Sequence, residues 1–197
     1  MKVTAIKQQV KQKDRYSIFV DGKYSFSLSE GALLDNQLNI GQELDDRQLK
    51  ELKRQSADDK VYNLALRYVA IRMRSEWEIH SYLERKKVSP ALVNTILNRL
   101  SDYGYVDDKK FAEAWVNNRR LLRPTSLRKL QQELRTKRVS SEVIEQVLAG
   151  GETDELAVLR DLVAKKRARY PNRLKFMQYL ARQGFGYSDI KAVLDEE

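Results

Sequence analysis

The residue pair most typical of an enzyme is Asp107-Asp108. Neighbouring carboxylates can hold a metal ion or act as general acid and base. However, adjacent helical residues point in different directions, and both aspartates stand where a helix is expected to begin. Acidic side chains at that place cap free backbone N–H groups and complement the helix dipole. We therefore predict a structural role for this pair, and the same for Asp45-Asp46 and Asp58-Asp59.

Other catalytic residue types are scarce. The chain has no cysteine, which excludes disulfides, thiolate zinc sites, iron–sulfur clusters and cysteine nucleophiles. Its single histidine, His80, falls in an expected amphipathic helix and is predicted to be a packing or surface residue. The sequence has no P-loop, GxGxxG or GxSxG motif. We expect no enzyme activity, no cofactor and no metal site.

Basic residues carry the strongest chemical signal. The chain has 37 Lys and Arg against 28 Asp and Glu, a formal net charge of +9, which favours anionic partners. Residues 105–150 concentrate this charge, with ten basic and six acidic side chains. A further basic cluster spans residues 165–169. The predicted partner-binding or nucleic-acid-binding residues are Arg72, Arg74, Arg119, Arg120, Arg123, Arg128, Arg135, Lys137 and Arg138. A solvated surface that complements helix dipoles is the alternative.

The N-terminal segment is predicted to be a small β-hairpin region. Residues 2–28 read as strands, with Asp21-Gly22 as the turn between two β-rich runs, and Ser29-Glu30 as a helix start. From about Asp45 onward the apolar residues fall at helical spacing. Phe111 and Trp115 lie on one helix face, where packing in the core is favoured over stacking on single-stranded nucleic acid.

The helical part repeats with a unit of about 50 residues. A shift of 51 residues aligns Ser75 with Ser126, and a further shift of 46 aligns Leu130 with Phe176. The breaks between helices also align: Val88-Ser89, Val139-Ser140 and Phe185-Gly186. We predict three three-helix repeats that stack on one another and bring their basic residues into a stripe.

The predicted domains are an N-terminal β-hairpin and helix extension over 1–56, and repeats over 57–104, 105–150 and 151–197. The helices expected are 58–71, 76–86 and 90–103 in the first repeat, 107–121, 124–137 and 141–148 in the second, and 154–168, 172–183 and 187–194 in the third. Gly150-Gly151-Glu152 is the clearest linker.

Nothing in the sequence suggests a membrane protein. The longest apolar stretches are far shorter than the roughly 20 residues of a spanning helix, and the N-terminus lacks the apolar core of a secretory signal. We expect a cytoplasmic protein, and a monomer because the repeats supply one another's partner surfaces.

Two sequence strings resemble the RecX family. One is Gly104-Tyr-Val-Asp-Asp-Lys-Lys-Phe-Ala112, followed by Arg119 and a helix ending in Gln132-Glu-Leu-Arg-Thr-Lys137. The other is Arg72-Met-Arg-Ser-Glu-Trp-Glu-Ile79 with Leu83 and Lys86-Lys87. The resemblance covers about residues 57–195. Where the family often has glycine, this chain has Lys87, Arg138 and Arg123-Pro124.

The resemblance implies a mainly α fold, an elongated and curved tandem array of three three-helix repeats. It also implies a regulator in DNA repair, recombination and the SOS response. Such a protein lies in the groove of the RecA filament on single-stranded DNA, with possible weak direct DNA contact. There it is expected to inhibit RecA ATPase, filament growth and strand exchange.

Two alternatives belong to other classes of protein. One is a sequence-nonspecific or helix-turn-helix-like DNA-binding protein that acts without RecA. Against it, the third helix of each repeat has few base-reading side chains. The other is a helical scaffold that binds an unrelated acidic protein.

Overall fold

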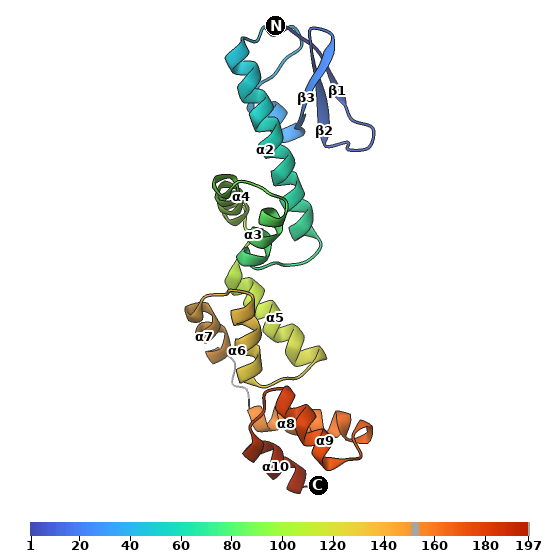
Figure 1. The fold of residues 1–197 in the computed structure, drawn as a ribbon, viewed down its shortest axis with the longest axis vertical. Coiled ribbons are helices and arrows are strands. Elements are labelled where there is room, and N and C mark those ends of the chain that lie inside the picture. Colours follow the sequence, from blue (N-terminus) through green and yellow to red (C-terminus); the bar gives the residue numbers. More distant parts are fainter. Residues whose placement is uncertain (151–153, 197) are drawn as a thin grey trace. The chain divides into compact units, whose positions relative to one another are not determined.

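The computed structural model describes residues 1–150 and 154–196, so most of the expected linker, residues 151 and 152, lies outside the described residues. The chain folds as two compact units. The first comprises residues 1–72 and 83–99, and the second residues 73–82 and 100–197. Figure 1 shows the elements in chain order: a small sheet first, then helices only. The mainly α fold with an N-terminal β region is thus confirmed.

The sheet has three antiparallel strands in the order β1 (Val3–Gln8), β2 (Arg15–Val20) and β3 (Lys23–Ser29). The predicted turn is present, with Asp21 and Gly22 at φ values of 48° and 80°. Ser29 then caps the short helix α1 (Glu30–Asp35), accepting a hydrogen bond from the Ala32 N–H. One face of the sheet buries an apolar cluster that includes Ile18 and Leu28.

Helix α2 (Asp46–Ala70) begins earlier than predicted. A capping box between Asp45 and Gln48 starts it, so Asp58-Asp59 lies mid-helix and not at a helix start. Asp59 is nevertheless structural, because its buried carboxylate pairs with Arg15 at 2.9 Å. The expected domain boundary between residues 56 and 57 falls inside α2, where buried Ser56 donates to the Ser27 carbonyl (2.6 Å).

The remaining helices follow the predicted sets of three. After α2 come α3 (Glu76–Arg85) and α4 (Pro90–Asp102). The second repeat has α5 (Asp108–Leu122), α6 (Leu127–Thr136) and α7 (Ser141–Ala149). The third has α8 (Glu155–Lys166), a 3-10 turn (Arg167–Arg169), α9 (Arg173–Arg182) and α10 (Tyr187–Asp195). Helix α6 starts at Leu127, later than Pro124, because Ser126 is its N-cap.

The second and third repeats each have their own apolar core, and the aligned positions occupy equivalent places in it. Leu130 and Phe176 are fully buried, as are Leu134 and Leu180. Phe111 belongs to the core of the second repeat, and half-buried Trp115 packs against that core. The repeat register derived from the sequence is therefore confirmed.

The turn after each middle helix needs one residue in the left-handed region. Lys87, Arg138 and Gly184 occupy it, with φ values of 60°, 58° and 94°. After Lys87 and Arg138 the next N–H bonds back to a helix carbonyl, from Val88 to Leu83 (3.2 Å) and from Val139 to Leu134 (3.3 Å). Glycine adopts this conformation without strain, whereas lysine and arginine do not. The positive φ at this position explains why glycine is common there in the family. In this chain Lys87 and Arg138 adopt the same conformation despite their side chains.

Across residues 1–150 and 154–196, no helix combines the length and the apolar character needed to cross a bilayer.

Candidate partner-binding site

The middle helices of neighbouring repeats meet end to end in the second compact unit. Ser75, just before α3, donates its hydroxyl to the carbonyl of Lys137 at the end of α6 (3.1 Å). At the equivalent place in the next pair of repeats, the Ser126 N–H donates to the carbonyl of Gln183 at the end of α9 (3.1 Å). The aligned serines thus mark two equivalent junctions.

The Asp107-Asp108 pair caps two different helices. Asp107 accepts from the Lys110 N–H (3.0 Å) at the start of α5, and this bond holds the pKa of its carboxyl below the usual value. Asp108 accepts from the Glu76 N–H (2.8 Å) at the start of α3, and burial raises its pKa. The structural role predicted for this pair is confirmed. Its contribution to the junction between repeats was not visible in the sequence.

Two of the predicted binding residues belong to an internal network of charges around Trp115. The Lys137 ammonium lies 2.6 Å from the buried carboxylate of Glu78 and 5.3 Å from the Trp115 ring centroid. On the same ring, the Arg119 guanidinium lies 4.8 Å from the centroid. Arg119 Nε and Trp115 Nε1 both donate to Glu133 Oε2, at 2.7 and 2.8 Å.

In this network Arg119 and Lys137 hold neighbouring helices in place through ion pairs with Glu133 and Glu78. Both side chains are 23% exposed, and each has a carboxylate partner within its own chain. Sequence analysis missed Glu78, Trp115 and Glu133 as part of the site. The available signal was the i, i+4 spacing of Trp115 with Arg119 and of Glu133 with Lys137, which places each pair on one helix face.

Four other predicted residues are exposed: Arg123, Arg128, Arg135 and Arg138. Arg128 and Arg135 are seven residues apart on α6 and share a face. Arg138 follows the helix, and Arg123 ends α5. Within the part of the chain that the structure describes, none of the four is in an ion pair. We refer to these four exposed arginines together as the basic surface of the second repeat.

The remaining three predicted residues lie elsewhere. Arg72 is exposed and Arg74 half-buried in the loop between α2 and α3, and Arg120 is half-buried on α5. Arg128 lies in the first turn of α6, at the opposite end of that helix from Arg135.

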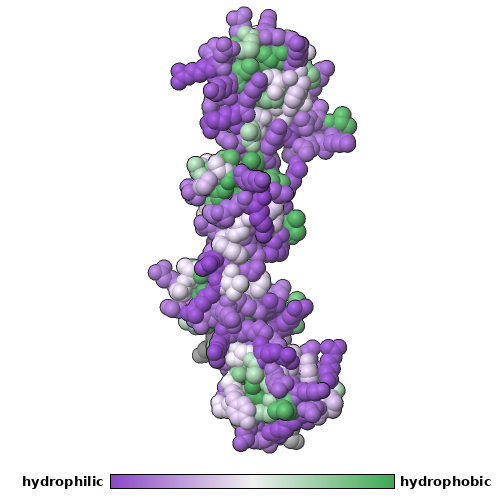
Figure 2. Space-filling view, in the orientation of Figure 1, coloured by the Kyte–Doolittle hydropathy of each residue, from purple (hydrophilic) through white to green (hydrophobic). Residues whose placement is uncertain are grey.

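The predicted stripe does not continue onto the other middle helices at the position of Arg128. By the repeat alignment that position holds Trp77 on α3 and Leu174 on α9, which are 41% and 65% exposed. This position faces solvent in every repeat. Because its side chain does not pack in the core, the fold does not require a particular residue type there. The basic surface is therefore strongest on the second repeat. Figure 2 shows a mainly hydrophilic surface with scattered apolar residues on the face in view.

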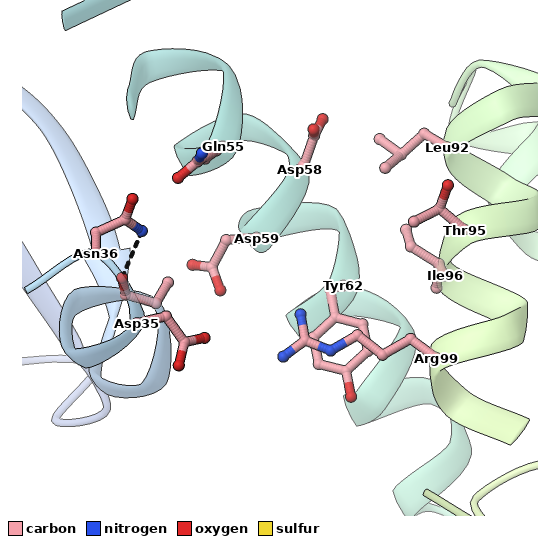
Figure 3. Close-up of a pocket in the computed structure, with 11 residues that line it drawn as sticks. Asp35, Asn36, Gln55, Asp58, Asp59, Tyr62, Leu92, Thr95, Ile96 and Arg99 are labelled. Carbon is pink, nitrogen blue, oxygen red and sulfur yellow. Dashed lines mark hydrogen bonds between the residues drawn. The ribbon is translucent and has the colours of Figure 1, made fainter. Parts of the chain in front are cut away.

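The first compact unit holds a cavity of about 400 Å³ whose lining is mainly acidic, in contrast to the basic surface of the second repeat. Asp35, Asp58 and Asp59 line it, and Arg99 lies over the Tyr62 ring, 4.1 Å from its centroid (Figure 3). Asp59 is engaged by Arg15 and by the Ser29 N–H (2.9 Å). This acidic lining does not favour an anionic ligand.

Comparisons with known proteins agree with the repeat architecture. Sequence profiles described as RecX first, second and third three-helix domains match residues 62–100, 107–148 and 152–194, and one described as the regulatory protein RecX N-terminal domain matches residues 1–45. A crystal structure of a regulatory protein RecX superposes with a TM-score of 0.77 at 28% identity, covering 98% of both chains. A RecX from Lactobacillus salivarius has the same fold, with a TM-score of 0.56 at 24% identity over 71% of this chain and 95% of that one.

Curated relatives lead to the same family. Regulatory protein RecX of Bacillus subtilis is 30% identical over 201 residues, covering 98% of this chain and 76% of that protein. Regulatory protein RecX of Listeria welshimeri is 36% identical over 148 residues, which are 75% of this chain and 55% of that protein. With this identity over nearly the whole chain, and with all four domain profiles matched in order, the chain belongs to the RecX family of regulatory proteins.

Proposed function

We propose that this chain binds the groove of the RecA filament on single-stranded DNA and inhibits RecA ATP turnover, filament growth and strand exchange. This would make it a cytoplasmic, monomeric regulator of DNA repair, recombination and the SOS response. Membership of the RecX family supports a regulatory role. The observation that carries the proposal is the basic surface of the second repeat, where exposed arginines have no carboxylate partner among the described residues.

The basic surface suits a polyanionic partner that presents repeated sites. Arg128 and Arg135 project from one helix face, so both can contact a single acidic or phosphate-bearing surface. Weak contacts made by successive repeats would add up through effective concentration. We propose that the repeats over residues 57–104, 105–150 and 151–197 are the contacting modules, and that residues 1–56 are an N-terminal extension.

The nine predicted residues divide into two roles in this proposal. Arg123, Arg128, Arg135 and Arg138 make the contacts of the second repeat, and Arg72, Arg74 and Arg120 contact the partner each from its own element. Arg119 and Lys137 hold the second repeat in place through Glu133 and Glu78. Substitution of the exposed arginines therefore tests binding, whereas substitution of Lys137 tests the fold.

The experiment compares binding to naked and RecA-coated single-stranded DNA at about 150 mM salt, near physiological ionic strength. RecA ATP turnover is followed in the same titration. We expect preference for the coated strand and reduced turnover, both lost in the double variant Arg128→Glu/Arg135→Glu. Equal or tighter binding to naked DNA, with turnover falling only as RecA is displaced, would instead favour a DNA-binding protein that acts without RecA.

A further inference from the structure

The second and third repeats enclose a cavity of about 400 Å³ with a strongly cationic lining, which we call the junction cleft. Arg119 and Arg123 from the end of α5, Lys129 from α6 and Lys166 from the end of α8 line it. Among the described residues, Glu133 is its one acidic lining residue. Because Glu133 already accepts from Trp115 and Arg119, the cleft keeps an excess of positive charge.

Among the residues that the structure describes, none provides a carboxylate partner for the other three cations of the junction cleft. Lys129 Nζ donates to two neutral oxygens, the Arg182 carbonyl (2.8 Å) and Gln183 Oε1 (3.0 Å). No ion pair engages Arg123 or Lys166 within residues 1–150 and 154–196. Like charges gathered in one concave site repel each other, so an anion bound there lowers the free energy of the whole site.

A buried hydroxyl in the cleft wall points to the same kind of ligand. Thr125 is only 8% exposed, and its Oγ1 has no hydrogen-bond partner among the described residues. Such a group is costly unless a ligand or water satisfies it. Burial also raises the pKa of Tyr179, another lining residue, so its phenol stays protonated and can donate a hydrogen bond.

Thr125 also borders a smaller cavity of about 70 Å³, which has balanced charges. Glu155 and Asp161 line that cavity together with Arg120 and Lys165. An anion would meet two carboxylates there, whereas the junction cleft offers it cations. The lining charges therefore favour the larger cavity over the smaller one as a place for an anion.

We infer that the junction cleft binds a phosphate group. Guanidinium forks, ammonium groups and a hydroxyl together match the several acceptor oxygens of a phosphate. The phosphate belongs either to the backbone of single-stranded DNA or to a free phosphate or nucleotide. Its connection to the RecA filament rests on the proposed function, but the site itself does not.

The first measurement is a titration of the intact chain with inorganic phosphate at constant ionic strength, followed by amide NMR shifts. We expect saturable shifts at Thr125, Lys129 and the Trp115 indole, and none at Lys175 or Lys191. Shifts that never saturate, or that spread equally over exposed lysines, would overturn the inference.

A charge-matched pair of double variants isolates the cleft. Arg123→Gln/Lys166→Gln removes two lining cations, and Lys175→Gln/Lys191→Gln removes two exposed cations of the third repeat outside the cleft. Phosphate affinity should fall at least tenfold in the first variant and stay within twofold in the second. Equal losses in the two would show that only net charge matters, and would refute the site.

Thr125→Val supplies a readout that does not depend on charge. Valine keeps the shape and removes the unsatisfied hydroxyl, so Tm of the free protein should rise by about 2–4 °C while phosphate affinity falls several-fold. Unchanged phosphate affinity would remove Thr125 from the site and overturn this part of the inference.

A short oligo-dT titration distinguishes the two sources of phosphate. Oligo-dT that competes with phosphate and shifts the same amides identifies a nucleic-acid backbone, and phosphate binding without competition identifies a free phosphate or nucleotide. Both outcomes support the site. Absence of phosphate binding in a protein that still inhibits RecA would refute the site and leave the proposed function standing.

Discussion

Basic residues that are neighbours in the sequence have different roles in the second repeat because their surroundings differ. Lys137 and Arg135 are two residues apart at the end of α6. Lys137 pairs with a buried carboxylate, whereas Arg135 is exposed and is in no ion pair among the described residues. Removing the partner of a buried charge is far more costly than removing a solvated charge. Stability measurements can therefore separate positioning residues from contact residues.

Lys137→Ala should lower the free energy of unfolding by about 3 kcal/mol, because it leaves the Glu78 carboxylate buried without its ammonium partner. Urea denaturation followed by tryptophan fluorescence measures this loss. Arg135→Ala is the control and should change stability by less than about 0.5 kcal/mol. Equal effects of the two substitutions would argue against the positioning role of Lys137.

Arg138→Gly should stabilise the chain by about 0.5–1 kcal/mol, because Arg138 adopts a φ of 58° that glycine reaches without strain. Arg138→Ala removes the same charge but keeps a Cβ atom, so it should leave stability nearly unchanged. Thermal unfolding of the two variants isolates the backbone contribution. If both variants unfolded at the same temperature, strain at this turn would be negligible.

At the scale of elements, short polar contacts decide where helices begin and how neighbouring repeats meet. Asp107 caps α5, and Ser126 caps α6 while its N–H bonds to the end of α9. Gly184, at the end of α9, lies so close to Ser126 that an added Cβ would fall 2.2 Å from its Oγ. Helix ends in this protein therefore serve both as caps and as junction contacts.

Asp107→Ala should cost about 1 kcal/mol at pH 7 through loss of the cap. Because the folded state lowers the pKa of this carboxyl from 3.8, its stabilisation is complete above that value and is lost as pH falls through the lower folded pKa. The gap in Tm between wild type and variant should therefore narrow as pH falls below 3.8. In Asp107→Asn the neutral acceptor remains, so its stability relative to Asp107→Ala should persist at low pH.

Gly184→Ala should destabilise the second unit by at least about 2 kcal/mol, since the new Cβ meets Ser126 and Lys129 at a φ of 94°. Gly104→Ala is the matched control, because Gly104 also has positive φ (71°) but nothing lies within 4 Å of its Cβ position. The control should lose only about 1 kcal/mol. Similar losses in chemical denaturation would mean that the close approach at the junction relaxes easily.

At the scale of the whole molecule, the two compact units do not follow the repeat boundaries. The division falls within α3, so residues 73–82 belong with the second and third repeats. Ser75, Glu76 and Glu78 explain this, because each bonds to a residue of the second repeat. Charge is also unevenly placed, since the second repeat has basic exposed arginines and the first unit holds an acidic cavity.

This uneven charge predicts that position, more than net charge, sets affinity for a polyanion. The affinity for single-stranded DNA, coated or naked, falls as salt rises, and the slope of log K against log salt concentration measures this dependence. The triple variant Arg128→Gln/Arg135→Gln/Arg138→Gln should reduce the magnitude of that slope by about 2. The matched control, Lys11→Gln/Lys13→Gln/Lys23→Gln, removes the same charge from exposed positions of the first unit. It should change the slope by much less. Equal changes in log K against log salt would point to net charge alone.

Much of the local structure could be predicted from the sequence. Apolar spacing gave the three repeats and their register, and Asp21-Gly22 gave the hairpin turn, because these features depend on residues close together in the chain. Asp107 and Ser126 were visible as helix starts for the same reason. The start of α2 was misplaced because the capping box at Asp45 competes with the equally acidic Asp58-Asp59.

The sequence by itself thus determined the fold class, the repeats and the basic excess of the second repeat. Only the tertiary structure decided which cations are available to a partner, since that depends on residues distant in the chain. Glu78 engages Lys137 across 59 positions, and Lys129 reaches Gln183 across 54. The junction cleft arises in the same way, from side chains of α5, α6, α8 and α9 that no local pattern brings together.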